Sequence, residues 1–359
     1  MVTSAVPPHE APEIPAAPRK PRKTLVRRLS LDRSQQTRRA VQFAFLLLNA
    51  FLGVQFLLWV RYYESHGATM YVDRPAGVDG WLPIAGLINL RYFLATRHIP
   101  DIHPSALVLF GVFLAASMLL KKAFCSWLCP VGTLSEMAHK VGQRLFGRNF
   151  RIWLWLDLLL RGIKYLLLLL FVVFILLGMS ADAVVTFLDA PYWAVSDVKM
   201  LRFFTHMSGT TMVVLVSLTS LSLFYKMFWC RYLCPYGALL GLASMISPFK
   251  IRRDASGCTG CRRCTAACPS GLEVHTCTAV SSPECTGCLT CTAHCPEKNV
   301  LAMQPLFWTR PLSIWVFPSV VILIFVAGIT AGMVSGHWKS SLSYADYQRL
   351  IPLVGNLTH

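Results

Sequence analysis

Five apolar stretches, each about as long as a bilayer is thick, constrain the fold of this chain more than any other feature. A helix needs about 20 residues to cross ~30 Å of hydrocarbon. The stretches comprise residues 40–60, 104–120, 165–182, 208–225 and 312–333. Only 14% of all residues are charged, against about 25% in soluble globular proteins. The sequence therefore predicts a mainly α-helical, integral membrane bundle of about five transmembrane helices.

Three further segments fit the surface of such a bundle. Residues 81–94 are apolar but too short to span and include Arg91, so we expect an interfacial or re-entrant segment. Residues 153–164 mix tryptophan and leucine with charges, which predicts an amphipathic helix lying at the inner surface. In residues 344–351, apolar side chains recur at near-helical spacing, which predicts a short amphipathic helix after the last span.

The positive charges lie mainly in alternate loops. The formal net charge is +17, and 26 of the 34 lysines and arginines lie in residues 1–39, 121–164 and 226–311. Cytoplasmic loops of membrane proteins carry such an excess, so these segments are predicted to lie inside and the C-terminus outside. Membrane orientation thus explains the charge, and no nucleic-acid partner is expected.

The N-terminal segment precedes the first span. Residues 1–23 contain six prolines, which prevent a helix or strand from propagating. The first apolar stretch begins too late for a cleaved signal peptide. We therefore expect residues 1–39 to form a disordered, basic cytoplasmic tail.

Two tandem cysteine runs lie between the fourth and fifth stretches. Each has the spacing Cys-x2-Cys-x2-Cys-x3-Cys-Pro, over residues 258–269 and then 285–296. This is the bacterial ferredoxin arrangement for two 4Fe–4S clusters, in which the fourth cysteine of each run ligates the other cluster. We expect a first set of ligands, Cys258, Cys261, Cys264 and Cys295, and a second set, Cys285, Cys288, Cys291 and Cys268.

Other uses of these cysteines fit less well. Zinc sites pair two CxxC elements and do not need three cysteines plus Cys-Pro twice. Disulfides do not suit a segment on the reducing side of a membrane. Cys277 lies between the runs, and we expect a free thiol rather than a ligand, because eight cysteines already complete both clusters.

A CxxxCP motif is repeated at the inner ends of two spans, in residues 124–134 and 229–239. A short aromatic and basic segment upstream is repeated as well, in residues 90–93 and 201–204. The chain is therefore predicted to contain an internal duplication. A CxxxC spacing on one helix would place both sulfurs on the same face, one turn apart.

The cysteines of this motif are Cys125, Cys129, Cys230 and Cys234. If the two halves pack as equivalent partners, the four sulfurs converge where the halves meet. They would then suit Cu(I), a further cluster or dithiol redox chemistry. The alternative is that they are buried structural cysteines. Their repetition beside a ferredoxin-like domain favours a redox or metal site.

Haem is not expected in this chain. No histidine lies within the five stretches, and there is no CxxCH motif. His98, His103 and His206 are predicted to lie at the outer interface, where a histidine would suit a quinone headgroup. The alternative is that they are simply solvated.

Two CxxxCP helix ends followed by a two-cluster domain inside a multispan protein resemble the NapH/MauN group of membrane polyferredoxins. The resemblance covers residues 85–300, and the same core occurs in the related NosR and CcoG proteins. Only 39 residues precede the first span here, so no flavin domain of the NosR kind is expected. The short tail after the last span leaves no room for the immunoglobulin-like domain of CcoG.

The resemblance implies a multi-pass protein of the bacterial inner membrane. Such a protein would pass electrons between a quinol pool or cytoplasmic donor and an extracytoplasmic oxidoreductase of respiration or the assembly factors of that enzyme. We expect an electron-transfer component rather than an enzyme. One alternative is a maturation factor that binds and reduces copper through the CxxxCP cysteines. Another is a structural subunit whose clusters only stabilise it.

These inferences divide the chain into five parts. They are a cytoplasmic tail (1–39), a membrane domain with both CxxxCP motifs (40–249), an inserted cytoplasmic two-cluster ferredoxin-like domain (250–304), a last transmembrane helix (305–335) and a periplasmic tail (336–359).

Overall fold

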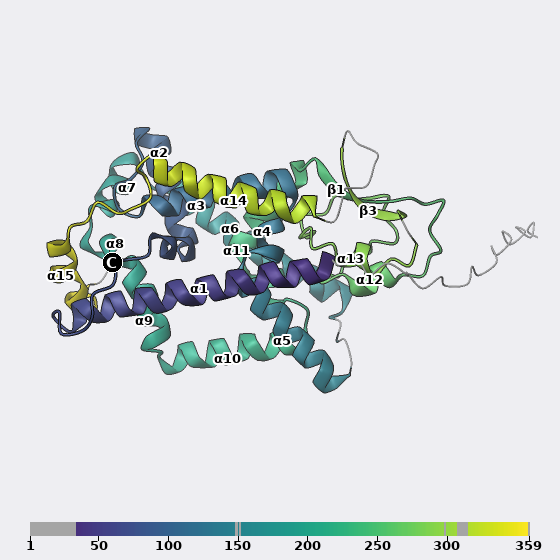
Figure 1. Cartoon of the computed structure of the whole chain (residues 1–359), viewed down its shortest axis with the longest axis horizontal. Coiled ribbons are helices and arrows are strands. Elements are labelled where there is room, and N and C mark those ends of the chain that lie inside the picture. The colour runs from purple at the N-terminus through teal and green to yellow at the C-terminus, as the bar shows by residue number, and fades with distance from the viewer. Residues whose placement is uncertain (1–33, 148–149, 151, 298, 307–314, 358–359) are drawn as a thin grey trace, which may run out of the picture.

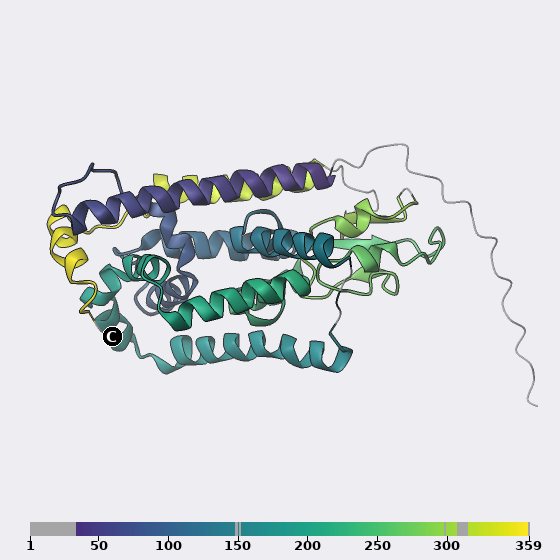
Figure 2. The ribbon, with the colours of Figure 1, turned by 90° about the horizontal axis from the view of Figure 1, so that it is seen from below.

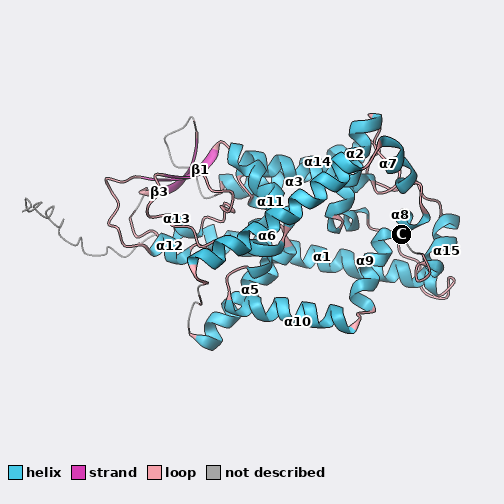
Figure 3. Ribbon diagram, turned by 180° about the vertical axis from the view of Figure 1, so that it is seen from behind, coloured by secondary structure: helices cyan, strands magenta, loops and turns pink. Residues whose placement is uncertain are grey.

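The computed structural model describes residues 34–147, 150, 152–297, 299–306 and 315–357. Its long helices run roughly along one axis (Figure 1), and its strands gather at one end (Figure 3). We call this end, formed by residues 249–305, the ferredoxin end. The opposite end, where α15 (Tyr344–Leu353) lies, is called the distal end.

Helix α1 (Ser34–Glu64) runs from the ferredoxin end to the distal end along one edge of the molecule (Figure 2). It begins at Ser34, so residues 34–39 are helical and do not belong to a disordered tail as predicted; residues 1–33 lie outside the described part. Arg38 and Gln42 extend the helix because they find buried hydrogen-bond partners instead of water.

Three of the described helices are long and apolar enough to cross a membrane. They are α1, α6 (Leu154–Val172) with its π-helical extension Val173–Gly178, and α14 (Val316–Val334). Helices α9 (Ser196–Thr205) and α10 (Gly209–Phe224) would make a fourth span only together, across a 77° bend. Helix α3 (Pro104–Leu120) is apolar but shorter. The chain is thus a helical membrane protein, and five spans stay a prediction.

The start of α6 corrects one expectation. Residues 154–164 are not a separate surface helix, because α6 runs without a break from Leu154 into its apolar part. Asp157 is buried and Lys164 is fully buried. Their charges are accommodated inside the protein by ion pairs, which periodicity alone does not reveal.

Helices of each CxxxCP copy pack on helices of the other copy. In the first copy, α2 (Pro83–Thr96) and α3 lead to α4 (Ala123–Trp127) and α5 (Pro130–Phe146). In the second, α9 and α10 lead to a π-helical turn (Trp229–Leu233) and α11 (Pro235–Ala243), followed by a 3₁₀ turn (Ser244–Ile246). Helix α5 packs on α10 of the second copy, and α11 packs on α3 of the first. This packing brings the two motifs together.

The ferredoxin end is a small three-stranded antiparallel sheet with two short helices. Strand β1 (Phe249–Arg253) lies between β2 (Ala279–Val280) and β3 (Leu301–Pro305). Helices α12 (Arg263–Ala267) and α13 (Thr290–Ala293) pack against each other. The apolar interior of this end is continuous with that of the bundle through Trp127 and Phe317. The ferredoxin end is therefore fused to the helices rather than tethered to them.

The distal end is built from short elements. These are a 3₁₀ turn (Ala76–Trp81), α7 (Ala181–Leu188), α8 (Pro191–Ala194) and α15. Helix α15 begins with a capping box between Ser343 and Asp346. Its Tyr347 and Ile351 are buried in one cluster with Trp59 of α1. The predicted amphipathic helix is confirmed, and it rests on α1 of its own chain.

Candidate functional site

The two tandem cysteine runs adopt the same backbone conformation. Gly260 and Gly287 have positive φ angles of 69° and 61°, a region that glycine enters without steric cost. Two residues further on, Arg262 and Leu289 have φ angles of 56° and 57° and cap α12 and α13. Each Cys-x2-Cys-x2-Cys segment therefore wraps into an equivalent tight loop.

The surroundings of the two loops differ. Cys261 is exposed and Cys258 half-buried in the first loop. In the second loop, Cys285, Cys288 and Cys291 are all at most 9% exposed. One candidate centre therefore faces the surface of the ferredoxin end, and the other faces the helices.

Cys268, the last cysteine of the first run, lies with the cysteines of the second run. Burial raises the pKa of its thiol to about 11, and the nearby thiols of Cys288 and Cys285 add to this. Cys291 is within electrostatic range of all three and also of Cys264, which belongs to the first set. Buried thiols of this kind are ligands that a 4Fe–4S cluster takes, and the assignment of the second set stays a prediction.

Each CxxxCP motif spans a helix break. Cys125 lies in α4, whereas Cys129 has extended backbone angles and is the N-cap of α5. Cys230 and Cys234 repeat this arrangement at the π-helical turn and α11. The expectation of two sulfurs on one helix is therefore wrong. The physical reason is the proline after the second cysteine, which disfavours a helical conformation of the residue before it.

The four CxxxCP thiols nevertheless lie within electrostatic range of one another, although no three of their sulfurs come within 4.8 Å of each other among the described residues, and we call them the four-cysteine site. Cys230 is within electrostatic range of Cys125, Cys129 and Cys234. The backbone N–H of Gly237 donates to Sγ of Cys234 at 3.2 Å. Burial raises the pKa of every thiol, to about 11 for Cys129. Binding of a metal would therefore have to displace protons.

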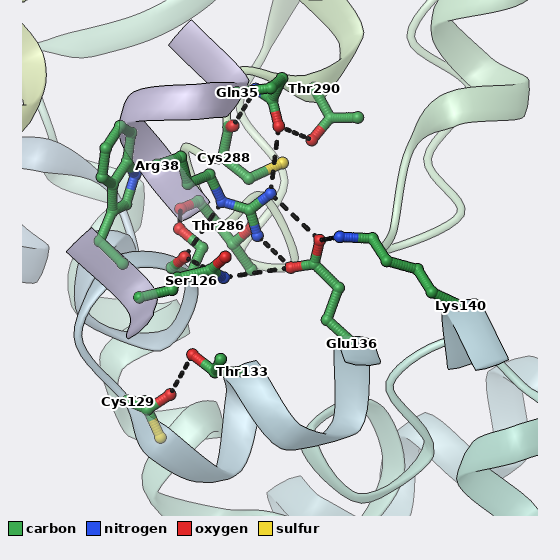
Figure 4. A network of polar contacts seen from close by, with 12 residues as sticks. Gln35, Arg38, Ser126, Cys129, Thr133, Glu136, Lys140, Thr286, Cys288 and Thr290 are labelled. Carbon is green, nitrogen blue, oxygen red and sulfur yellow. Dashed lines mark hydrogen bonds and ion pairs between the residues drawn. The ribbon is translucent and has the colours of Figure 1, made fainter. Parts of the chain in front are cut away.

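The second ferredoxin loop is docked on the first CxxxCP motif (Figure 4). Ser126 Oγ donates to the carbonyl of Thr286 at 2.7 Å. Trp127 Nε1 donates to the carbonyl of Gly287 at 3.2 Å. Both donors lie between Cys125 and Cys129 in the sequence, so the residues inside the motif hold the loop that carries the second set.

The first turns of α1 reinforce this docking (Figure 4). Gln35 Nε2 donates to the carbonyl of Cys288 at 3.0 Å, and Arg38 Nε donates to the carbonyl of Ser126 at 3.1 Å. Arg38 also pairs with Glu136 of α5. Burial alone would raise the pKa of Glu136, but Arg38 and Lys140 lower it to about 2. Helix α1 thus joins both cysteine sites.

A buried carboxylate holds the other side of the second ferredoxin loop in place through ion pairs. Glu284, directly before Cys285, pairs with Nζ of Lys164 at 2.6 Å and accepts from the Tyr165 hydroxyl at 2.9 Å. Lys122 Nζ lies 3.8 Å from the same carboxylate. The sequence did not identify Lys122, Lys164 and Glu284 as residues of a site. The feature that could have indicated them is the position of charged residues directly beside apolar segments.

The second CxxxCP motif also contacts the ferredoxin end. Arg231 pairs with Asp157 of α6 at 2.8 Å, and Tyr232 donates to the same carboxylate. The guanidinium of Arg231 lies against Gly271, where a side chain would meet Nη1 at 2.7 Å. Both copies of the motif therefore touch the ferredoxin end.

The three histidines expected at the outer interface have different surroundings. His103 is fully buried, and its Nδ1 lies 3.0 Å from Asp79 Oδ1, so solvation is wrong for this residue. His98 is exposed. His206 lines a surface hollow of about 660 Å³ together with His66, Arg202, Glu64 and Pro352.

Cys277 is exposed. Its Sγ makes two weak contacts, 3.7 Å from the carbonyl of Glu273 and 3.8 Å from Oγ1 of Thr276. Its role as a spare thiol stays a prediction.

Two family models match the chain. One, described as a 4Fe-4S binding domain, matches residues 102–149 and again residues 205–254. The other, described as a 4Fe-4S dicluster domain, matches residues 250–296. The first model thus matches each CxxxCP copy, and the second matches the tandem cysteine runs.

Known relatives are similar over much of the chain. YccM of Escherichia coli, for which a role in electron transport is proposed, is 46% identical over 90% of this chain and 91% of its own length. The ferredoxin-type protein NapH of Haemophilus influenzae is 28% identical over 60% and 75%. The methylamine utilization ferredoxin-type protein MauN of Paracoccus denitrificans is 29% identical over 41% and 48%. No solved structure matches the chain.

Proposed function

The chain belongs to the NapH/MauN-type membrane polyferredoxins, and we propose that it passes electrons between a quinol pool or cytoplasmic donor and an extracytoplasmic respiratory enzyme or its maturation. Its 4Fe–4S-binding domains and the naming of its relatives give it an iron–sulfur electron-transfer role. The partners and the side of the membrane belong to the proposal. In this proposal it acts as an electron-transfer component of a redox system.

Two groups of cysteines would hold the clusters. The first set would hold one 4Fe–4S cluster near the surface, and the second set would hold another against the helices. When bound, such clusters accept and donate single electrons. The exposure of Cys261 supports entry or exit of electrons at the surface. The burial of Cys285 and Cys291 supports exchange with the membrane domain.

The docking of the second loop on the first CxxxCP motif is the observation that carries the proposal. Ser126 and Trp127 hold the backbone of Thr286 and Gly287 directly. A domain that only stabilised itself would not need its buried cysteine loop fixed to a second thiol site. The four-cysteine site is therefore the proposed next redox site, at the end of α3 and α10.

Charge supports the orientation. The ferredoxin end and the N-terminal tail carry the excess of lysine and arginine, which favours the cytoplasmic side of a bacterial inner membrane. The distal end and α15 would then face the periplasm. Electrons would reach that side through the four-cysteine site or through a quinone. The hollow beside His206 would suit the quinone headgroup.

The test is cluster content in the full chain, purified anaerobically in detergent. We expect low-temperature EPR of the reduced protein to show two interacting clusters. Cys264→Ser should remove the signal of the first set and Cys268→Ser that of the second, whereas Cys277→Ser should leave both. An unchanged pair of signals in the Cys264 and Cys268 variants would refute the ligand assignment.

Copper handling is the second candidate, because four buried thiols are a donor set that Cu(I) prefers. Purified protein would then carry about one Cu(I), lost on replacing Cys125 and Cys230 with serine. Absence of copper together with quinol-driven cluster reduction would favour the electron relay instead.

A further inference from the structure

Lys121, the residue after α3, has a buried charge that the fold does not explain. Its side chain is fully buried. Its Nζ has no hydrogen-bond partner among the described residues. A buried ammonium without a counter-charge is strongly unfavourable, so buried lysines are normally paired. Among the described residues, no anionic group is hydrogen-bonded to Lys121 Nζ.

The backbone at Lys121 is held in an unusual conformation. Its φ of 62° and ψ of −173° lie in a region that is essentially restricted to glycine. The surrounding structure maintains this conformation, because the Lys121 N–H donates to Ser247 Oγ at 3.1 Å and its carbonyl accepts from Ala123 at 2.6 Å. A non-glycine residue in such a conformation suggests that the side chain itself is needed at this position.

The unusual backbone sends two successive lysines to different sites. The Cβ of Lys121 lies beside Gly287, and the thiol nearest in electrostatic effect is Cys285. The next residue, Lys122, donates from Nζ to the carbonyl of Gly237 at 3.2 Å. Its charge acts on Cys125 in the four-cysteine site. Lys121 thus lies beside the second set, whereas the charge of Lys122 acts on both Cys285 and Cys125.

Resting on the proposed function, we propose that Lys121 is the counter-charge of the cluster held by the second set and raises its reduction potential. A cluster bound by four thiolates is an anion, and reduction adds one more negative charge. A fixed, buried cation therefore stabilises the reduced form more than the oxidised form. No such buried lysine adjoins the solvent-exposed Cys261 among the described residues, so electrons on the ferredoxin end favour the second set.

The experiment is an EPR-monitored redox titration of the full chain in detergent, comparing wild type with Lys121→Met. Methionine keeps most of the volume and removes the charge. We expect the reduction equilibrium of the second set to become at least tenfold less favourable, a midpoint lower by about 59 mV for one electron. The midpoint of the first set should not move.

Two variants serve as controls. Lys250→Met removes a charge near Lys121 from a half-buried position on β1, and should change the second-set equilibrium less than twofold. Lys121→Arg keeps the charge and should keep a midpoint close to that of wild type. If Lys121 had only a structural role, methionine and arginine would not differ in this way.

The outcomes separate the two proposals. Two clusters with an unchanged second-set midpoint in Lys121→Met would overturn this inference and leave the proposed function standing. Absence of clusters from the wild type would overturn both. If Lys121→Met loads no clusters, Lys121→Arg decides: normal loading and midpoint support the need for a cation, and failure of the arginine variant too would overturn it.

Discussion

The two ends of the molecule differ in how completely their buried charged side chains are paired. At the distal end, Arg74 pairs with Asp79 at 2.6 Å and with Asp197 at 2.7 Å, and His103 completes the group. At the opposite end, beside the second loop, Glu284 pairs with Lys164, but Nζ of Lys121 has no hydrogen-bond partner among the described residues. The distal group is fully paired within the folded chain, whereas one buried lysine beside the second loop is not.

The distal group also shows why a cluster of ligand-type residues is not by itself a metal site. Asp79, His103 and Asp197 each have a ligand atom within 4.8 Å of the others. The guanidinium of Arg74 lies among them and supplies the positive charge that a metal would bring. The distal group is therefore an internally paired structural cluster.

Removal of Arg74 should have the largest effect. Arg74→Met would leave two buried carboxylates without their counter-charge, and breaking such a group costs about 3–5 kcal/mol. We expect unfolding in detergent at markedly lower temperature or denaturant concentration. The exposed Arg349→Met is the matched control, with a change within about 0.5 kcal/mol. Equal stability of both variants would show that the distal group is not structural.

Glu284→Gln should have an intermediate effect at the ferredoxin end. The amide still accepts a hydrogen bond from Lys164, but the counter-charge is lost, at a cost of about 2 kcal/mol. We expect earlier unfolding and faster proteolysis of the ferredoxin end, because Glu284 anchors the second loop. Glu273→Gln, an exposed carboxylate of the same domain, should leave both measurements unchanged. Identical proteolysis of the two variants would contradict the anchoring role.

Smaller effects should appear as pH is varied, and with opposite sign at the two ends. Burial opposes the charge of His103, but Asp79 raises its pKa above the ordinary 6.5. Its contribution is therefore full below pH 6.5 and is lost as pH rises through the raised value. The pKa of Glu136 falls from 4.5 to about 2, so its contribution is full above pH 4.5 and is lost between there and pH 2.

Stability in detergent as a function of pH tests this contrast. His103→Asn should remove the decline on the alkaline side, and Glu136→Gln should remove part of the decline on the acid side. If His103→Asn changed the loss of stability on the acid side, or Glu136→Gln changed the loss on the alkaline side, the two groups would not act independently.

The smallest effect is expected at Cys277. Its thiol is exposed and makes only weak contacts, so Cys277→Ser should change stability by less than about 0.5 kcal/mol. Iron content and EPR signals should match those of wild type, as measured on the same preparation. Loss of one iron–sulfur signal would instead make Cys277 a ligand.

Local sequence signals were sufficient for several elements. The fourth apolar stretch was predicted to begin with Ser208 as its helix cap, and Ser208 does cap α10 by accepting from the Thr211 N–H at 3.2 Å. The equivalent φ angles of Gly260 and Gly287 follow from equivalent spacing in the two cysteine runs. By contrast, the CxxxC pairs were placed on one helix, because the helical spacing was weighed without the effect of the following proline.

The buried charges could not be predicted in the same way. The sequence pattern places Lys164 at the end of an amphipathic segment. In the structure it pairs with Glu284, which lies 120 residues away in the sequence. A charged residue is exposed or buried according to its partner, and pairing over such a separation depends on how the helices pack. The same holds for His103, whose partner Asp79 lies in a separate turn.

The sequence by itself determined the apolar helices, the two cysteine runs and the duplicated CxxxCP motif, because these depend on spacing along the chain. Only the tertiary structure decided three further features. Helices of each CxxxCP copy pack on helices of the other, the four CxxxCP thiols lie within electrostatic range of one another, and Lys121 and Lys122 have different surroundings. Those features arise from contacts between segments distant in sequence, and the energy of a buried charge depends on what lies next to it in space.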